Sequence, residues 1–246
     1  MHVGALIIGD ELLSGKRQDK HLAALIRILA ERGMKLAWAE YLGDVPARIE
    51  DAMRRALQSD ELVFSFGGIG ATPDDHTRQA VAAAARVELA LHPEARSLIE
   101  ERFGDEAYPH RIHMGEFPVG SRIIPNPVNQ IPGFSYGDLH CVPGFPSMAW
   151  PMVGWVLDTH YSQLKNEQPD VERSLRAVGA REGDLIELMQ YFVTRYPSLR
   201  FSSLPSFAHD DVPGHIEFGF SGPPGLVELA LSELRKALEM RGYPLP

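Results

Sequence analysis

The sequence predicts an α/β protein: a three-layer, mostly parallel sheet with helices on both faces, followed by a small α+β domain. Short apolar runs rich in β-branched and aromatic residues alternate with segments whose apolar residues recur at helical spacing. A polar, proline-bearing stretch at residues 163–170, QLKNEQPD, then separates a second pattern from the first. We therefore expect a ligand-binding domain at residues 1–165 and a small domain at residues 171–246.

Strands and helices alternate through the first hundred residues. The run VGALII ends at a glycine and an aspartate, as a buried strand does, and the helical segment after it ends at Gly33. Parallel strands need crossover helices, so this region predicts a covered parallel sheet. The expected strands are residues 3–8, 35–42 and 62–66, and the expected helices are residues 21–32, 46–58, 74–85 and 93–103.

The region from residue 104 to residue 144 is rich in proline, which interrupts its short apolar segments. Proline removes a backbone donor and is tolerated mainly on edge strands and in turns. We expect loops here, with short strands at residues 121–124 and 139–142 on the edge of the sheet. A helical pattern returns at residues 147–164.

The C-terminal segment predicts the order βαββα, with two helices packed on one face of a sheet. We expect the loop that contains His209, Asp210 and Asp211 to be solvated. The expected strands are residues 172–179, 201–207 and 215–220, and the expected helices are residues 184–195 and 225–240.

Composition and charge exclude several classes of function. A net charge of −9 argues against a general nucleic-acid binder, and no apolar run approaches the length that spans a bilayer. The first apolar run meets Asp10 and Glu11 too early for a signal peptide. The single cysteine, Cys141, excludes an internal disulfide and a cysteine metal cluster, and we expect it to be buried. These features predict a cytoplasmic protein that binds neither nucleic acid nor a membrane.

The stretch LVFSFGGIGATPDDHT carries the strongest functional signal. Gly67, Gly68 and Gly70 allow backbone N–H groups to approach a ligand closely, after a strand and before a helix whose N-terminus favours an anion. The pattern matches neither a P-loop nor the dinucleotide fingerprint. The alternative is a plain turn in which Thr72 or Asp74 caps the following helix.

Carboxylates near this turn indicate a cation beside the anion. Asp75 is in the turn itself, and Asp10 and Asp44 follow the first two strands, whose carboxyl ends meet at one sheet edge. Mg²⁺ is commonly held by one or two carboxylates together with phosphate oxygens. For each aspartate taken alone, a helix cap or a solvated turn residue is the alternative.

Other loops contribute candidate contacts. In the first loop, GDELLSGKRQDKH, Ser14, Gly15 and Lys16 can bind a phosphate, whereas Lys16 and Arg17 can equally form a solvated pair. The rigid turns NPVNQIPG and VPGFPS can form a wall or lid over a ligand, or serve packing alone.

Taken in order over residues 3–160, the motifs GDELLSG, GGIGATPDDHT, NP…PGF and PGFPS resemble the domain of molybdenum-cofactor biosynthesis proteins of the MoaB/Mog type. They resemble still more closely the N-terminal part of the competence/damage-inducible CinA proteins, and the βαββα unit resembles their following small domain. The amidase domain that ends full-length CinA proteins has no counterpart in this sequence, so the resemblance implies no amidase activity.

The resemblance implies a site for the phosphate of a pterin or nucleotide, with molybdopterin as one ligand. It also implies a divalent metal (Mg, Mn or Co), with Asp44 and Asp75 as its ligands and as the catalytic residues. The residues assigned to ligand binding are Asp10, Glu11, Ser14, Gly15, Gly67, Gly68, Gly70, Thr72, Asp74, Pro143 and Gly144.

The chain departs from the family pattern around this site. Lys20 and His21 stand where the family has Thr and Asn, and Ala71 stands where it has Pro. Asn129 lies inside the usual Gly-Thr-Ala-Pro-Gly turn, and Met148 replaces an acid.

Three hypotheses of function follow. The first is metal-dependent hydrolysis of a nucleotide diphosphate such as ADP-ribose, in which the metal activates water and the glycine-loop N–H groups stabilise developing charge. The second is a molybdopterin-binding protein without hydrolysis, and the third is a non-catalytic regulatory module. We also expect a homo-oligomer.

Overall fold

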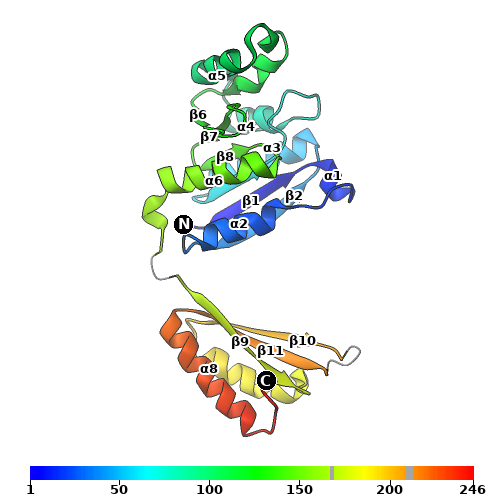
Figure 1. The fold of residues 1–246 in the computed structure, drawn as a ribbon, viewed down its shortest axis with the longest axis vertical. Coiled ribbons are helices and arrows are strands. Elements are labelled where there is room, and N and C mark those ends of the chain that lie inside the picture. The colour runs from blue at the N-terminus through cyan, green and yellow to red at the C-terminus, as the bar shows by residue number, and fades with distance from the viewer. Residues whose placement is uncertain (167–168, 209–212) are drawn as a thin grey trace. The chain divides into compact units, whose positions relative to one another are not determined.

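The computed structural model describes residues 1–166, 169–208 and 213–246. The chain forms two compact units, Met1–Asn166 and Glu167–Pro246 (Figure 1). The loop around His209, Asp210 and Asp211 that the sequence predicts to be solvated lies outside the described residues. Each unit is described by itself.

The N-terminal unit is built on a six-stranded sheet in the order β2-β1-β3-β8-β7-β6. The pairs β1–β2, β1–β3 and β3–β8 are parallel, and the last two pairs are antiparallel. The sheet is thus mostly parallel, as predicted. Its strands are β1 (Val3–Ile8), β2 (Leu36–Leu42), β3 (Leu62–Phe66), β6 (Arg122–Ile124), β7 (Gly133–Tyr136) and β8 (Leu139–Val142).

Strand β8 corrects the prediction that residues 139–142 lie at the sheet edge. It lies inside the sheet, with β3 on one side and β7 on the other. All four of its residues, LHCV, are buried, as expected of an interior strand. The flanking prolines are in the turns rather than in the strand, so they place no limit on its pairing. Cys141 is buried in this strand, as predicted.

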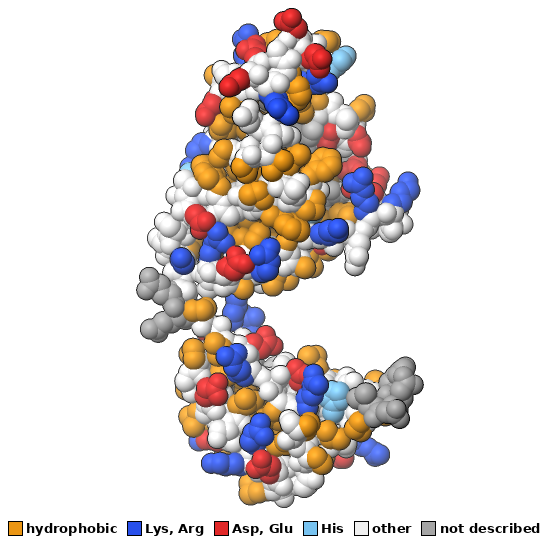
Figure 2. Space-filling model, in the orientation of Figure 1, with side chains coloured by type: hydrophobic (Ala, Val, Ile, Leu, Met, Phe, Trp, Pro, Cys, Tyr) orange, Lys and Arg blue, Asp and Glu red, His pale blue; other side chains and the backbone are white. Residues whose placement is uncertain are grey.

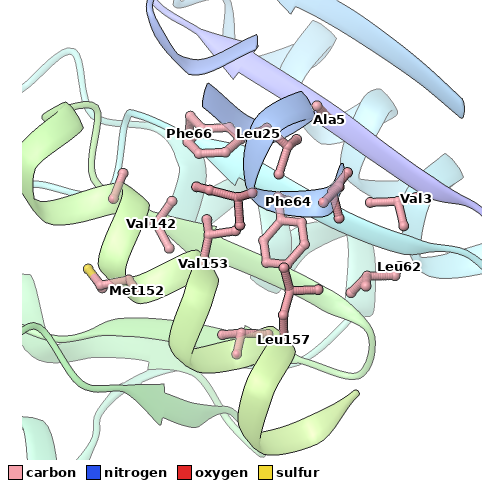
Figure 3. Close-up of a cluster of buried hydrophobic side chains, with 14 of the residues drawn as sticks. Val3, Ala5, Leu25, Leu62, Phe64, Phe66, Val142, Met152, Val153 and Leu157 are labelled. Atoms are coloured by element: carbon pink, nitrogen blue, oxygen red, sulfur yellow. The ribbon is translucent and has the colours of Figure 1, made fainter. Parts of the chain in front are cut away.

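Helices cover both faces of the sheet. On one face α2 (His21–Ala30) and α6 (Pro146–His160) pack on Val3, Phe64 and Phe66, with Leu25, Val153 and Leu157 filling the interface (Figure 3). On the other face α3 (Pro46–Gln58) and α4 (Thr77–Ala85) enclose a second cluster that includes Leu6, Val63 and Cys141. Two separate cores around one sheet confirm the three-layer architecture.

A smaller lobe follows α4. The antiparallel pair β4 (Leu89–Leu91) and β5 (Glu116–Pro118) is joined through α5 (Pro93–Phe103) and two short 3₁₀ helices, η1 (Gly104–Ala107) and η2 (Arg111–Gly115). Ile99, Ala107 and Ile112 form its buried core. This lobe is relevant to the site because Arg78 of α4 joins η2 and β5 to the loop that precedes α4.

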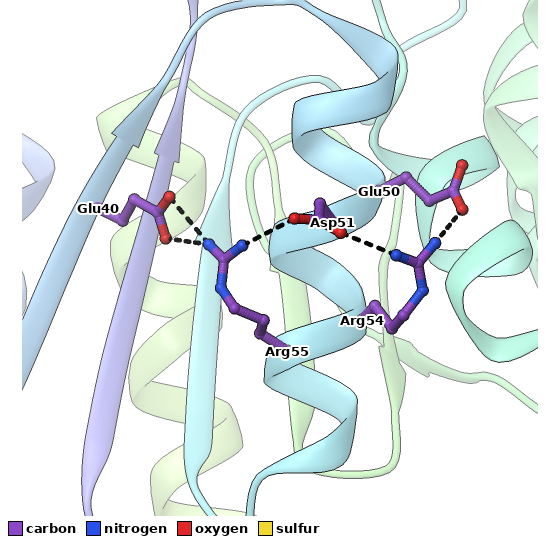
Figure 4. Close-up of polar contacts among 5 residues, drawn as sticks. All are labelled: Glu40, Glu50, Asp51, Arg54 and Arg55. Atoms are coloured by element: carbon purple, nitrogen blue, oxygen red, sulfur yellow. Dashed lines mark hydrogen bonds and ion pairs between the residues drawn. The ribbon is translucent and has the colours of Figure 1, made fainter.

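An ion-pair network covers the outer side of α3. Arg55 pairs with Glu40 of β2 and with Asp51, and Arg54 pairs with Asp51 and Glu50 (Figure 4). These side chains are largely exposed, so each pair contributes at most about 1 kcal/mol to the free energy of unfolding. Stability of this layer therefore comes mainly from the buried face of α3.

The C-terminal unit is a three-stranded antiparallel sheet in the order β10-β11-β9, with two helices. The inward side chains of β9 and β11 share one buried core with both helices, which therefore lie on a single sheet face (Figure 1). This confirms the predicted α+β unit. Its elements are β9 (Val171–Val178), α7 (Glu182–Arg195), β10 (Arg200–Ser206), β11 (His215–Gly222) and α8 (Pro224–Glu239).

Among the described residues, no helix combines the length and the apolar character needed to cross a membrane. The remaining short helices are α1 (Asp10–Leu13) and η3 (Ser162–Leu164).

Candidate functional site

A cavity of about 500 Å³ lies at the carboxyl ends of β1, β3 and β8. Open α/β sheets bind ligands at this edge, because the loops after adjacent strands converge there. We call it the glycine-loop cavity. Its lining residues are Ile8, Gly9, Glu11, Arg17, Asp44, Gly67, Gly68, Ile69, Gly70, Ala71, Thr72, Asp74, Asp75, Phe103, Met114, Asn126, Asn129, Ile131, Pro132, Pro143, Gly144, Phe145 and Met148.

Residues 67–72, the glycine loop, connect β3 towards α4. Gly67 and Gly68 have φ angles of +98° and +67°, a region that L residues rarely adopt. A Cβ atom on Gly67 would lie 2.5 Å from the carbonyl oxygen of Ile8, and one on Gly68 would lie 2.5 Å from Thr77 Oγ1. Only glycine therefore lets the loop pass this close to β1 and α4.

Four consecutive backbone N–H groups of the loop, at residues 68–71, make no hydrogen bond with the described part of the protein. The amides on either side are used: Gly67 N–H donates to the Val142 carbonyl at 3.0 Å, and Thr72 N–H donates to Asp75 Oδ2 at 2.9 Å. A run of unpaired backbone donors in a loop can bind an anion.

The start of α4 differs from the prediction. The helix begins at Thr77, not at residue 74, and neither Thr72 nor Asp74 caps it. Asp75 instead closes a turn by accepting hydrogen bonds from the backbone and the hydroxyl of Thr72. Thr77 Oγ1 donates to the Gly67 carbonyl at 2.9 Å, and its N–H donates to Gly68. These contacts draw the chain into a loop where the pattern alone favoured a helical turn.

A buried arginine holds the far side of the loop. Arg78 is 2% exposed, and its Nε and Nη2 both donate to the Gly70 carbonyl, at 3.1 and 2.7 Å. Its Nη1 donates to the carbonyl oxygens of His113 and Glu116 in the smaller lobe. Because the loop's carbonyl side is engaged in this way, its N–H groups remain available to a ligand.

Asp10 and Asp44 bind each other's backbone. Asp10 N–H donates to Asp44 Oδ2 at 2.9 Å, and Asp44 N–H donates to Asp10 Oδ1 at 3.1 Å. Burial raises the pKa of Asp44, the Asp10 N–H opposes this, and the charges of Asp10, Glu11 and Asp74 raise it further. The acidic wall of the cavity thus disfavours further negative charge at Asp44.

Another part of the lining is apolar and comes from distant segments. Phe145 is 58% exposed beside the cavity, and Met148, Phe103 and Met114 lie along the same lining. An exposed aromatic ring in a cavity can stack on a planar ligand. The lining therefore combines unpaired donors and carboxylates with aromatic and thioether side chains.

The predicted site residues are divided between this cavity and its surroundings. The structure brings together most of them, but Asp10, Ser14 and Gly15 do not line the cavity. Asp10 supports the site through Asp44, and Ser14 and Gly15 are exposed around the end of α1. The predicted residues in the lining are Glu11, Asp44, Gly67, Gly68, Gly70, Thr72, Asp74, Asp75, Pro143 and Gly144.

No metal cage accompanies the carboxylates. Within the described residues, no three or more His, Cys, Asp or Glu side chains gather in a way that can hold a metal ion. Asp44 and Asp75 both line the cavity, and one oxygen of each accepts a backbone N–H. They fit only a cation that takes one or two carboxylates and completes its shell with ligand oxygens.

Sequence reasoning missed three residues. Arg17 was open to interpretation as a solvated side chain, yet it lines the cavity. Arg78 follows the DDHT motif directly, but its carbonyl partners lie far along the chain. Phe145 stands inside the PGFPS motif, where an aromatic residue between proline and glycine turns is the only sequence signal.

Two departures from the family pattern have structural roles. His21 is 5% exposed and its Nε2 lies 3.1 Å from the Gly144 carbonyl, so it holds the VPGFPS turn from below. Since a carbonyl only accepts, Nε2 carries the proton in this pair. Met148 Sδ accepts a long contact of 3.6 Å from Asn129 Nδ2, which joins the two turns that the sequence predicted as a wall.

This fold is a three-layer α/β domain with a cavity at the carboxyl edge of its parallel strands, and comparison with known proteins identifies its family. Residues 4–163 match the family model described as a probable molybdopterin binding domain. The chain belongs to this MoaB/Mog-type family, among its CinA-like members.

Individual relatives agree with the family. A CinA-like protein from Gloeobacter violaceus is 31% identical over 197 residues, which cover 76% of this chain and 46% of that protein. A CinA-like protein from Anaeromyxobacter is 35% identical over 59% of this chain and 37% of its own length. The chain thus spans less than half the length of these two relatives. A protein from Pyrobaculum arsenaticum is 31% identical over 80% of this chain and 77% of its own.

A solved structure shows the same fold in the N-terminal unit. CinA from Thermoplasma acidophilum, whose function is described as unknown, superimposes with a TM-score of 0.59 and 26% identity. The match covers 64% of this chain and 96% of that one.

Proposed function

We propose that the glycine-loop cavity binds a phosphorylated pterin of the molybdopterin type. The run of four unpaired N–H groups at residues 68–71 is the observation that carries this proposal. A phosphate oxygen is an acceptor well suited to a run of unpaired backbone donors in a loop. The family description, a probable molybdopterin binding domain, supports a pterin as the group that carries the phosphate.

The apolar wall supports the pterin half of the ligand. Phe145 offers an exposed ring, and Met148 offers a polarisable thioether beside it. A planar heteroaromatic ring gains dispersion and quadrupole energy from such neighbours. At about 500 Å³, the cavity falls within the range of small-molecule sites, roughly 300–1,000 Å³.

Calorimetric titration tests the proposal. Molybdopterin should bind saturably to the purified chain, whereas the same pterin without its phosphate should bind at least about tenfold more weakly, because the charged hydrogen bonds are lost. Gly68→Ala is the matching variant, since its Cβ would displace Thr77 and the loop. Equal binding of the two pterins would contradict a phosphate role for the glycine loop.

A second candidate is metal-dependent hydrolysis of a nucleotide diphosphate such as ADP-ribose. The carboxylates of Glu11, Asp44, Asp74 and Asp75 around one cavity favour it, because together they attract a cation. Asp44 and Asp75 would hold Mg²⁺, Mn²⁺ or Co²⁺, which when bound supplies Lewis-acid activation of a phosphoryl group and of water.

Phosphorus NMR distinguishes the candidates. Incubation of ADP-ribose with the protein and each metal should release AMP if the second candidate holds. Asp75→Asn should then abolish turnover while keeping the fold, since an amide oxygen still accepts from Thr72. Asp51→Asn, an exposed carboxylate on α3, serves as the control. Absence of AMP with every metal leaves ligand binding, or the regulatory role, as the function.

We also propose that the protein self-associates. Hydrophobic side chains gather over α2 and α6 on one face of the N-terminal unit (Figure 2), where Ile26 is 50% and Trp155 36% exposed. Contiguous apolar surface of this kind favours an interface between copies of the chain. Light scattering at several protein concentrations measures the oligomeric state.

A further inference from the structure

Arg17 occupies an unusual position in the loop between β1 and α2. It lines the glycine-loop cavity and also a neighbouring cavity of about 340 Å³. Its side chain is exposed, and its guanidinium makes no ion pair or hydrogen bond with the described part of the chain. Its backbone is anchored, because Arg17 N–H donates to the Glu11 carbonyl at 3.0 Å.

The two cavities meet at Arg17. They share Ile8, Glu11, Arg17 and Gly144 in their linings. The second cavity is also lined by His21 and Phe66, whose ring centroids are 4.7 Å apart, and by Leu12 and Pro146. An anion bound beside Arg17 would therefore lie at the boundary of two spaces rather than in a closed pocket.

The charges of the glycine-loop cavity give Arg17 its significance. Four carboxylates line this cavity, whereas Arg17 is the single Lys or Arg in the part of its lining that the structure describes. Arg78 lies nearby, but its guanidinium already donates hydrogen bonds to carbonyl oxygens. A phosphate that enters this acidic surrounding needs a cation, and a free guanidinium offers a planar pair of donors that matches two phosphate oxygens.

Glu11 is the natural competitor for the guanidinium, since it lines both cavities as well. No ion pair joins the two side chains. The Glu11 carboxylate lies against its own loop, where a Cβ on Gly9 would be 2.5 Å from Glu11 Oε2. Arg17 is therefore left without an internal partner beside a cavity that has a surplus of negative charge.

We propose that Arg17 is the phosphate-binding side chain of the glycine-loop cavity and holds the ligand's phosphate where the two cavities meet. The ligand class is a phosphate or diphosphate whose oxygens receive hydrogen bonds from Arg17 and from the glycine-loop amides together. In this arrangement the protein's own cation reduces the repulsion between the phosphate and the carboxylates, and the phosphate binds without a divalent metal. That the bound phosphate belongs to a pterin rests on the proposed function, whereas the role of Arg17 in binding a phosphate does not.

Calorimetric titration in the presence of EDTA tests the proposal with two probes, molybdopterin and inorganic pyrophosphate. Arg17→Ala should weaken binding of both by about 10- to 100-fold, as expected for loss of charge-assisted hydrogen bonds. Arg17→Lys should recover part of the affinity, because it restores the charge but not the paired donors. Raising the salt concentration should weaken binding to the parent protein more than to Arg17→Ala.

Lys16→Ala is the matched control, since Lys16 is an exposed neighbour of the same charge that lines neither cavity. It should leave both affinities unchanged. Circular dichroism of each variant should match the parent protein, because neither side chain has an internal partner.

The outcomes separate this inference from the proposed function. If the parent protein binds molybdopterin and Arg17→Ala behaves like Lys16→Ala, the role of Arg17 is refuted and the proposed function stands. If the parent binds pyrophosphate but not molybdopterin, and Arg17→Ala loses that binding, the role of Arg17 stands and the pterin is refuted. Binding of neither probe overturns both, and binding that appears only with a divalent metal overturns the role of Arg17.

Discussion

Two of the strand-to-helix connections beside the glycine-loop cavity are stabilised in contrasting ways. The connection after β3 is held by buried groups, with Arg78 on the Gly70 carbonyl and Thr77 on the Gly67 carbonyl. The connection after β1 is held by an exposed and a half-buried carboxylate, through the exchange of hydrogen bonds between Asp10 and Asp44. Both lie at the same edge of one sheet (Figure 1).

This difference shows how the two loops can serve one ligand differently. In the glycine loop, side chains bind the carbonyl oxygens and leave consecutive N–H groups unpaired, so the donors are positioned before any ligand arrives. In the first loop the backbone is held by the carboxylates of Asp10 and Asp44, and the side chain of Arg17 is left unpaired. The glycine loop thus offers fixed backbone donors, whereas the first loop offers the flexible side chain of Arg17.

Removing the buried guanidinium should have the largest effect on this contrast. Arg78→Ala removes a charged donor from three carbonyl oxygens and the nearby cation from Glu116, so the free energy of unfolding should fall by about 3–5 kcal/mol. Arg54→Ala, an exposed arginine of α3, should cost at most about 1 kcal/mol. Denaturant titration of both variants gives the comparison, and equal losses would show that the glycine loop does not depend on buried support.

Matched glycine substitutions should produce the next largest difference. Gly67→Ala adds a Cβ 2.5 Å from a backbone oxygen at a positive φ and should destabilise the protein by about 2–4 kcal/mol. Gly15→Ala has a φ of +73° but nothing within 4 Å of the new atom, so only the conformational strain of about 1 kcal/mol should appear. Thermal unfolding measures both, and a larger loss at Gly15 would reverse the proposed ranking.

The smallest expected effect is a pH dependence from Asp44, whose carboxylate binds the Asp10 N–H of the first loop. The pKa of Asp44 is raised above its usual 3.8, so the folded protein keeps this proton to a higher pH than the unfolded chain. Its ionisation therefore lowers stability as pH rises from about 4 through the folded pKa, and the loss persists at neutral pH.

Asp44→Asn should remove this dependence, because the amide does not titrate yet still accepts the Asp10 N–H. At pH 7 the variant should be as stable as the parent protein or more stable by up to about 0.5 kcal/mol. The difference should vanish below about pH 4, where the parent carboxyl is protonated as well. Urea unfolding between pH 3 and pH 8 checks this, and a variant that is less stable at pH 7 than at pH 3, relative to the parent, would contradict it.

Several parts of the site follow from local pattern. Gly67 and Gly68 were predictable, since a glycine pair after a buried strand indicates a backbone that bulkier residues cannot follow. The convergence of Asp44 and the glycine loop followed from parallel strands, whose carboxyl ends share an edge. The start of α4 was not predictable, because Thr77 and Asp75 bond to the loop instead of to the helix.

Other features depend on partners that are distant in sequence. The two ring nitrogens of His140 form hydrogen bonds with the hydroxyls of Ser135 and Tyr161. The Tyr161 hydroxyl also donates to Asp138 Oδ1 at 2.6 Å. Burial lowers the pKa of His140 to about 3. Nothing in the run LHCV indicates this network. Likewise, the neighbouring prolines led to the prediction of an edge position for β8. Its interior position depends on pairing with β3, which the local sequence does not indicate.

The sequence by itself determined the class of the fold, the position of the glycine loop and the family, because hydrophobic period, glycine placement and motif order are local properties of the chain. Only the tertiary structure decided which side chains act at the site. It bound Arg78 to the Gly70 carbonyl, left Arg17 unpaired in the lining of two cavities and brought Phe145 into the lining of the glycine-loop cavity. The physical reason is that a charged or aromatic side chain acquires its role from the partners that folding places around it. Those partners come from segments that are distant in the sequence.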